Sequence, residues 1–228
     1  MYGMYGYGYG YGFDPTIILV LIGVALSLWA QGRVNSTFSR YSRVRSMTGM
    51  TGAEAARRLL NAQGIYDVTV QPIAGELTDH YDPRTKTVNL SQSVYGATSV
   101  AAIGVAAHEC GHAMQDNEGY APLRFRSALV PAANFGSKLS WPLILLGLVF
   151  GGLGSPLVEI GILMFSLAVL FQLVTLPVEY NASARAVRLL DSQGILAGEE
   201  VSGTRKVLNA AALTYVAAAA TSILQLLR

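Results

Sequence analysis

Long stretches without a charged side chain constrain this chain more than any other feature. The first runs from Pro15 to Gly32 and contains the segment TIILVLIGVALSLWA. Residues 139–158 and 160–178 are also uncharged, and only Glu159 separates them. Because a helix needs about 20 apolar residues to cross a bilayer, we predict one span at 15–32 and a hairpin of two short spans at 139–178. The segment GGLGSP inside that hairpin supplies the turn.

A fourth apolar segment, VLNAAALTYVAAAATSILQLL from Val207, is rich in alanine and threonine. Its composition is compatible with a membrane span and equally with a helix packed inside the protein. The charged fraction of the whole chain is 13%, against about 25% in soluble domains. We therefore expect a multi-pass protein of the cell membrane, in contact with the lipid bilayer.

The distribution of basic residues predicts the orientation of these spans. The residues before the first span carry no lysine or arginine, whereas six arginines follow it within residues 33–58. The positive-inside rule therefore places residues 33–138 in the cytoplasm and the tyrosine- and glycine-rich residues 1–14 outside, as a flexible tail. The hairpin returns the chain to the cytoplasm, where the segment 179–228 begins. Because the basic residues gather beside apolar segments, topology explains the net charge of +2, and we predict no nucleic-acid partner.

The polar segment 33–138 shows signals of both helix and strand. Thr51 and Glu54 have the spacing of a capping box, which predicts a helix that ends at Gly64. YDVTVQPI alternates like a strand, and ELTDHYDPRTKTVNLS reads as a β-hairpin that turns at DPRTK. From about residue 98 the chain is alanine-rich and reads as one helix. The sheet is small, so we expect a mainly helical fold.

The segment HECGHAMQD at residues 108–116 predicts a zinc site. Two residues four apart on a helix differ by about 40° of rotation, so His108 and His112 can reach one ion. Glu109 would lie beside that ion as the general base, which takes a proton from zinc-bound water. The alternative is a chance pattern on a buried helix. Cys110 points to another face, where a packed small side chain is expected rather than a zinc thiolate.

Catalytic zinc usually has three protein ligands, so the site needs a third. A metzincin would have glycine at position 115 and histidine at position 118, where this chain has Gln115 and Glu118. On a continuing helix Glu118 would be turned about 240° away from His112. The third ligand is therefore expected from another helix.

The segment PVEYNASARAVRLL offers Glu179 as the third ligand, at the end of the predicted hairpin. The alternative for Glu179 is a charge that caps a helix beginning after Pro177. Ser183 is one turn further on the same face, where it could orient a ligand. Asn181 and Arg185 are weaker candidates for the same role.

The segments HECGHAMQD, LTDHYDPRTKTVNLS and PVEYNASARA, with the spans around them, resemble the YugP-like putative neutral zinc metallopeptidases of bacterial membranes. They are also similar to the gluzincin pattern of HtpX-type and CAAX-prenyl-protease membrane peptidases, in which a glutamate of an ExxxD motif completes HExxH. Glu179 matches that glutamate, but Ser183 stands in place of the aspartate. The resemblance implies zinc-dependent hydrolysis of peptides or membrane proteins. The expected fold is a mainly α integral membrane protein with a small α+β, zincin-like cytoplasmic part, whose β-hairpin lies beside the HExxH helix.

The third histidine, His80, lies on or next to the predicted hairpin. In gluzincins a strand near the metal helix commonly pairs with extended substrate, and TVNLS is the candidate for that edge. His80 or Tyr81 could then stabilise an oxyanion. The alternative for His80 is a structural histidine whose ring contacts backbone groups.

We therefore predict a membrane-embedded zinc metalloendopeptidase with its active site at the cytoplasmic face. A second hypothesis is a membrane scaffold or chaperone that keeps a structural or vestigial zinc site. A transporter is disfavoured, because the spans hold almost no charge that could line a path.

Overall fold

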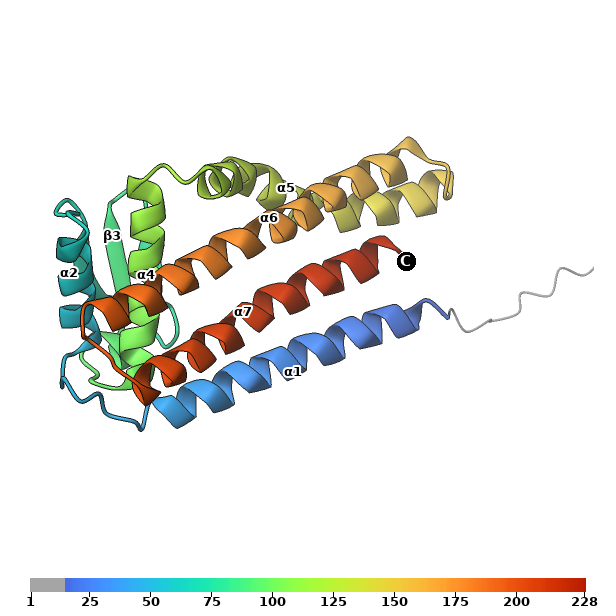
Figure 1. Ribbon diagram of the computed structural model, residues 1–228. Coiled ribbons are helices and arrows are strands. Elements are labelled where there is room, and N and C mark those ends of the chain that lie inside the picture. The colour runs from blue at the N-terminus through green and yellow to red at the C-terminus, as the bar shows by residue number, and fades with distance from the viewer. Residues whose placement is uncertain (1–14) are drawn as a thin grey trace, which may run out of the picture.

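The computed structural model describes residues 15–228, and the tail predicted at 1–14 lies outside them. Within this range four helices are long and apolar enough to cross a membrane: α1 (Ile17–Tyr41), α5 (Ala121–Gly151), α6 (Pro156–Ser192) and α7 (Glu199–Leu226). They extend from one side of a smaller head that holds the remaining elements (Figure 1). The mainly helical fold and the apolar membrane helices are thus confirmed.

The long helices are continuous beyond the uncharged stretches. Helix α1 runs on to Tyr41, and α6 passes through Pro177 to Ser192. The predicted hairpin ends at residue 178 and the next segment begins at 179, but α6 continues across this point without a break. Pro177 therefore does not begin a new helix. Helix α5 starts at Ala121, well before the predicted span, and contains Pro131. Proline lacks the N–H of the helical ladder, and α5 bends before it lies alongside α6 (Figure 1).

Glycines allow the long helices to approach one another closely. A Cβ on Gly136 of α5 would lie 2.4 Å from the Met164 carbonyl oxygen of α6. A Cβ on Gly23 of α1 would lie 2.8 Å from the Thr221 side chain of α7. Small residues at such contacts are typical of helix pairs within membranes, where backbones pack directly.

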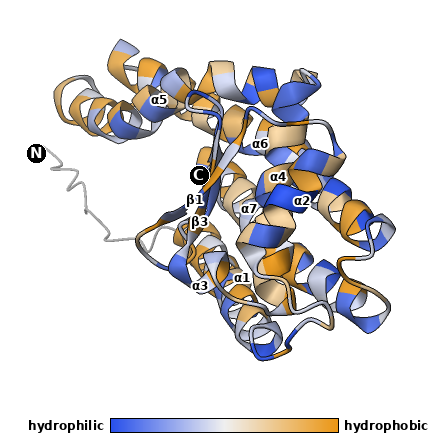
Figure 2. Ribbon diagram, turned by 90° about the vertical axis from the view of Figure 1, so that its left-hand side faces the viewer, coloured by the Kyte–Doolittle hydropathy of each residue, from blue (hydrophilic) through white to orange (hydrophobic). Residues whose placement is uncertain are grey.

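The surface of the long helices is apolar. Large hydrophobic side chains are exposed along α1 and α5, among them Trp29, Trp141 and Phe150. Figure 2 shows hydrophobic residues over much of α5, whereas α2 (Gly52–Ala62) in the head carries hydrophilic residues. Exposed apolar side chains on long helices are what a surface in contact with lipid requires.

The head contains a three-stranded sheet beside its helices. The strands are β1 (Thr69–Ile73), β2 (His80–Asp82) and β3 (Thr87–Ser91), and the short helix α3 (Gln92–Tyr95) follows. Strand β3 pairs antiparallel with β2, which confirms the predicted hairpin, and parallel with β1. The segment TVNLS is therefore the central strand, and its assignment as the edge that meets substrate is wrong. All five of its residues are buried, because β1 occupies the side that the sequence analysis left open.

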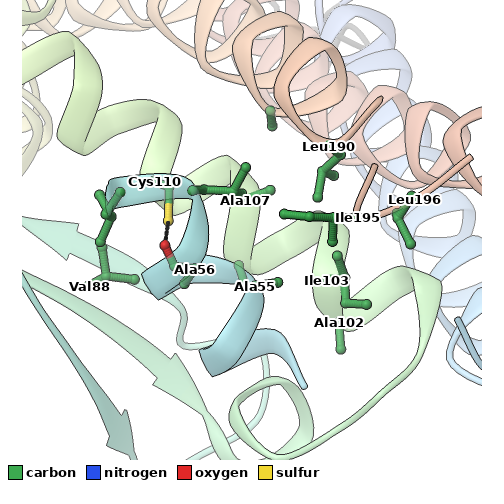
Figure 3. Close-up of a cluster of buried hydrophobic side chains, with 14 of the residues drawn as sticks. Ala55, Ala56, Val88, Ala102, Ile103, Ala107, Cys110, Leu190, Ile195 and Leu196 are labelled. Atoms are coloured by element: carbon green, nitrogen blue, oxygen red, sulfur yellow. Dashed lines mark hydrogen bonds between the residues drawn. The ribbon is translucent and has the colours of Figure 1, made fainter. Parts of the chain in front are cut away.

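Helix α4 (Val100–Asn117) runs through the middle of the head. The capping box of α2 is present as predicted, with Thr51 and Glu54 bonded to each other's backbone N–H groups. Buried side chains of α2, β3, α4 and α6 form one core around α4, shown in Figure 3. The Cys110 thiol lies in this core and contacts the Ala56 carbonyl oxygen at 3.6 Å. Burial, and then the charge of Glu109, raises the pKa of this thiol, so it should not react in the folded protein.

Candidate metal centre

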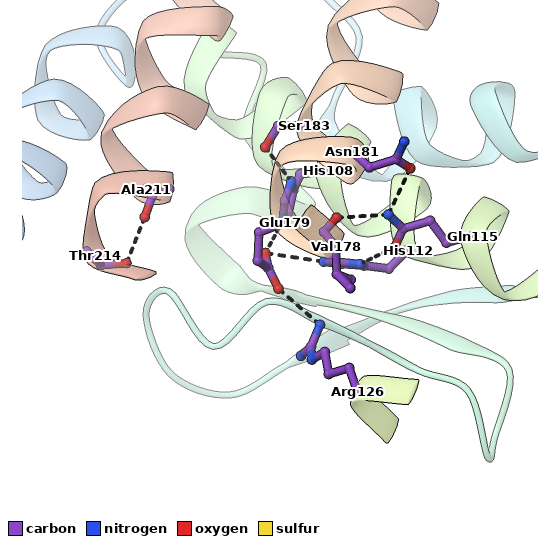
Figure 4. A network of polar contacts seen from close by, with 10 residues as sticks. All are labelled: His108, His112, Gln115, Arg126, Val178, Glu179, Asn181, Ser183, Ala211 and Thr214. Atoms are coloured by element: carbon purple, nitrogen blue, oxygen red, sulfur yellow. Dashed lines mark hydrogen bonds and ion pairs between the residues drawn. The ribbon is translucent and has the colours of Figure 1, made fainter. Parts of the chain in front are cut away.

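Two helices that are distant in sequence bring three potential ligands together. His108 and His112 lie one turn apart on α4, and Glu179 lies on α6. The Glu179 Oε2 atom is 3.1 Å from His108 Nε2 and 3.5 Å from His112 Nε2. Figure 4 shows both imidazoles pointing toward this carboxylate. Among the described residues these three form the only His, Cys, Asp and Glu group that could hold a metal ion.

The donor set fits zinc. Its ligand atoms all lie within 4.8 Å of one another. Ligand atoms about 2.0–2.1 Å from a tetrahedral zinc are themselves about 3.3 Å apart, close to the two distances from Glu179 Oε2. Two imidazole nitrogens and one carboxylate oxygen would leave the fourth position for water, the pattern of a catalytic rather than a structural zinc.

A glycine within the motif permits this approach of α4 to α6. A Cβ on Gly111 would lie 2.6 Å from the Ala182 carbonyl oxygen and 3.0 Å from its Cα. Any other residue at position 111 would therefore push α6 away from α4. Since Glu179 and Ser183 lie on the turns of α6 around Ala182, such a shift would separate them from His108.

The ring orientation of His112 is set by Gln115. The Gln115 amide nitrogen donates to the Val178 carbonyl at 2.8 Å and to Asn181 Oδ1 at 3.0 Å. Its oxygen therefore accepts a hydrogen bond from His112 Nδ1, at 3.0 Å. With the proton on Nδ1, the Nε2 lone pair of His112 is free to bind a metal ion. Gln115 is fully buried.

Ser183 holds the other imidazole. Its hydroxyl oxygen is 3.1 Å from His108 Nδ1, which leaves His108 Nε2 directed at Glu179. Ser183 thus occupies the orienting position expected one turn after Glu179. A hydroxyl in place of a carboxylate keeps the hydrogen bond but removes one negative charge from the surroundings of the metal ligands.

Gln115→Met should weaken zinc binding by about 10-fold to 100-fold, the usual loss when a partner of a metal-bound histidine is removed. Methionine keeps the approximate volume but leaves His112 Nδ1 without its acceptor. The measurement is a zinc titration of the purified protein against a competing chelator. Gln63→Met, at an exposed helix end, is the matched control. Equal zinc affinity in both variants would contradict this role of Gln115.

Two further side chains at the centre were missed by the sequence analysis. Arg126 of α5 lies 3.0 Å from Glu179 Oε1 through its Nη1 atom, and Figure 4 shows it approaching the carboxylate from the side away from the imidazoles. Tyr215 of α7 lines the cavities on both sides of the metal centre. No motif marks either residue, because each is placed by the packing of a long helix against α4 and α6.

Glu109, the residue after His108, lies next to the metal centre. The side chain is buried, with 8% of its surface exposed, and its carboxylate forms no hydrogen bond with any residue in the described range. It borders two cavities that meet at the metal centre, of ≈ 300 Å³ and ≈ 310 Å³. The first lies between α1, α4 and α7, and the second is bordered by β2 and α5.

The electrostatic field at the centre favours a cation. Burial of His112 disfavours its charged form, but the hydrogen bond to Glu179 and the charges of Glu109 and Glu179 outweigh burial and raise its pKa. The same carboxylates would stabilise a divalent cation held by the imidazoles.

The remaining candidates lie around this centre. His80 has its ring nitrogens near the Thr78 carbonyl oxygen at 2.8 Å and Asn89 Nδ2 at 3.2 Å, and the Tyr81 hydroxyl donates to Asp116. Both residues border the ≈ 310 Å³ cavity, but their polar side-chain atoms already contact the groups just named.

Asn181 and Arg185 lie behind Gln115, on the side away from Glu179. Asn181 Oδ1 accepts from Gln115 and from Arg185 Nε, while Arg185 also bonds the exposed Glu118 at 2.6 Å. Glu118 therefore faces away from the metal centre, as the helical rotation predicts.

Comparison with known proteins gives two matches. The model of a family described as "Putative neutral zinc metallopeptidase" matches residues 16–228. A curated protein of Bacillus subtilis (strain 168), "Putative membrane protease YugP", is 50% identical over 212 residues, which cover 93% of each chain. No solved structure was found to match the chain.

Proposed function

The chain belongs to the putative neutral zinc metallopeptidase family, and from this membership and the metal centre we propose that it is a membrane-embedded zinc endopeptidase. His108, His112 and Glu179 would be the zinc ligands, and Glu109 the general base. The observation that carries the proposal is the convergence of three donors on one point, with the Glu109 carboxylate, which has no partner in the described part of the chain, beside it.

Zinc bound here would supply a water molecule of lowered pKa and polarise the scissile carbonyl. Glu109 would take the proton of that water as it attacks and pass the proton to the departing amine. Ser183 and Gln115 would keep the two imidazoles in the orientation that Figure 4 shows. Arg126 would fix the Glu179 carboxylate through the oxygen that faces away from the imidazoles.

The free edge of β2 is the best candidate for the substrate backbone. Strand β2 pairs with β3 on one side, and no other strand of the described chain pairs with it. His80, Tyr81 and the loop after them border the ≈ 310 Å³ cavity that reaches Glu109. An extended peptide that adds to this edge would pass the metal centre. A strand edge beside the metal helix also supports a zincin-like head.

Tyr215 is our candidate for stabilising the negative charge that develops on the carbonyl oxygen. It borders both cavities at the metal centre, and its side chain interacts with the Glu179 carboxylate, so it lies next to the place where a bound carbonyl would meet the metal. His80 and Tyr81 would first have to leave their present partners to play this part. A hydroxyl donor at this point would stabilise the negative charge as it forms in the transition state.

A scaffold or chaperone with a structural zinc site is the competing function. Structural zinc sites usually have four protein ligands and no open position. This centre offers three ligands and borders two cavities, which favours catalysis. Hydrolysis that disappears in Glu109→Gln while zinc is retained would separate the two functions.

We also propose that the metal centre lies at the cytoplasmic face of the membrane, on the charge bias of residues 33–58. A cysteine introduced at Ser42, just after α1, should resist a membrane-impermeant maleimide in intact cells. One introduced at Leu153, 82% exposed in the turn between α5 and α6, should react. Labelling in opened cells controls for accessibility, and the buried Cys110 gives little background. The reverse labelling pattern would place the centre outside.

A further inference from the structure

A further cavity, of ≈ 690 Å³, lies away from the metal centre between α1, α6 and α7. Helix α7 packs between the other two (Figure 1). The cavity shares no lining residue with the two cavities at the metal centre. On both α1 and α7 its lining residues alternate along the helix with those of the metal cavity, so the two cavities lie on opposite faces of this helix pair. We call it the basic groove; its lining residues are Arg33, Ser36, Thr37, Arg40, Tyr41, Tyr180, Lys206, Asn209, Ala210 and Leu213.

The groove gathers positive charge without a counter-charge. Arg33 and Arg40 come from α1 and Lys206 from α7, and no aspartate or glutamate of residues 15–228 lines the groove. None of the three cations forms an ion pair with a described residue. Cations held together in this way repel one another, and an anion placed among them would relieve that repulsion.

Uncharged hydrogen-bond donors complete the groove. The side chains of Thr37, Tyr180 and Asn209 form no hydrogen bond with another residue of the described range. The positive-inside rule accounts for basic residues after a span. It does not account for their convergence from two helices, with free hydroxyl and amide groups, on one concave site.

The position of the groove along the membrane helices indicates which kind of anion it could bind. Arg33 is the first charged residue after the uncharged stretch of α1, and Lys206 is the last one before the uncharged stretch of α7. Tyr180 follows directly after the uncharged stretch of α6 and Glu179. The three helices therefore leave the hydrocarbon region at the groove, which places it among the lipid headgroups. Ala210 and Leu213 continue the groove toward the apolar side along α7.

We propose that the basic groove binds the phosphodiester of one anionic phospholipid. Arg33, Arg40 and Lys206 would contact the phosphate oxygens, and Thr37, Tyr180 and Asn209 the glycerol headgroup. The acyl chains would leave past Leu213 into the bilayer. Basic pockets between membrane helices at the surface are a recognised way of holding such headgroups. This binding is independent of the zinc chemistry at the metal centre.

The test compares two charge-matched variants of the full chain. Arg33→Gln/Lys206→Gln removes one cation from each side of the groove. Arg43→Gln/Arg45→Gln removes two exposed cations that follow α1 and do not line the groove. Native mass spectrometry of the protein in neutral detergent gives the dissociation constant of the first phosphatidylglycerol, with phosphatidylcholine as the neutral lipid. Circular dichroism establishes that each variant is folded, and the single variants Arg33→Gln and Lys206→Gln extend the comparison if the double variant unfolds.

The unaltered chain should bind phosphatidylglycerol more tightly than phosphatidylcholine. The groove variant should bind it at least tenfold more weakly, since each cation near a membrane surface contributes about fivefold; the control variant should stay within about twofold. Equal losses in both variants, or no preference for the anionic lipid, would overturn the proposal. In a second experiment inorganic phosphate is added to the lipid-bound protein, and chloride at the same ionic strength is the control. Displacement of the lipid by phosphate alone would assign the groove to a free anion instead.

Discussion

Glu179→Ala should remove zinc and hydrolytic activity together. The Glu179 Oε2 atom is the one point that both imidazoles contact, and a site of two histidines binds zinc poorly. We expect zinc affinity to fall by more than about 100-fold, beyond the loss for a residue that only orients a ligand. The substitution also leaves Arg126 without its carboxylate partner, so some loss of stability is expected as well.

The control for this prediction is Glu118→Ala. Glu118 is the acidic residue at the C-terminal end of α4, and it is exposed and bonded to Arg185. We expect full zinc content and full activity in that variant. Zinc is measured by elemental analysis of both purified variants, and thermal unfolding of the zinc-free proteins separates the loss of stability from the loss of the ligand. Full zinc in Glu179→Ala with loss of zinc in Glu118→Ala would refute the ligand set.

Glu109→Gln should abolish hydrolysis while zinc remains bound. Glutamine has the shape of glutamate but cannot take a proton from water, and a general base contributes about 10²-fold to 10⁴-fold to the rate. Because the Glu109 carboxylate forms no hydrogen bond with the described residues, the substitution breaks no contact of the fold. Glu118→Gln, at the end of the same helix, is the matched control. Equal turnover in both variants would show that Glu109 is not the base.

Features that depend on neighbouring residues could be predicted from the sequence. The spacing of His108, Glu109 and His112 requires only that α4 is a helix, and the capping box at Thr51 needs only the three residues that follow. The apolar helices follow from the absence of charge over lengths that a bilayer requires. Glu179 could be predicted as the third ligand because few other acidic residues lie close to a predicted end of a membrane span.

Features that depend on packing between distant segments could not be predicted. Strand β1 pairs parallel with β3, and nothing in TVQPI or TVNLS specifies that partner. The substrate edge was therefore assigned to the wrong strand. Arg126 reaches Glu179 because α5 bends over the head, and the buried role of Gln115 depends on the Val178 carbonyl of α6. Helix α6 continues through Pro177 for the same reason. Its packing against neighbouring helices overrides the local preference of proline for a helix start.

The proposal that the chain is a membrane peptidase is tested most directly in membranes that hold its substrates. Cells that produce the unaltered chain and cells that produce Glu109→Gln at equal amount and equal zinc content are compared by mass spectrometry of protein N-termini in their membrane fractions. We predict new internal N-termini in membrane or membrane-associated proteins with the unaltered chain, and their absence with Glu109→Gln. The same N-termini at the same abundance in both cells would contradict the proposal and favour a scaffold with a structural zinc site.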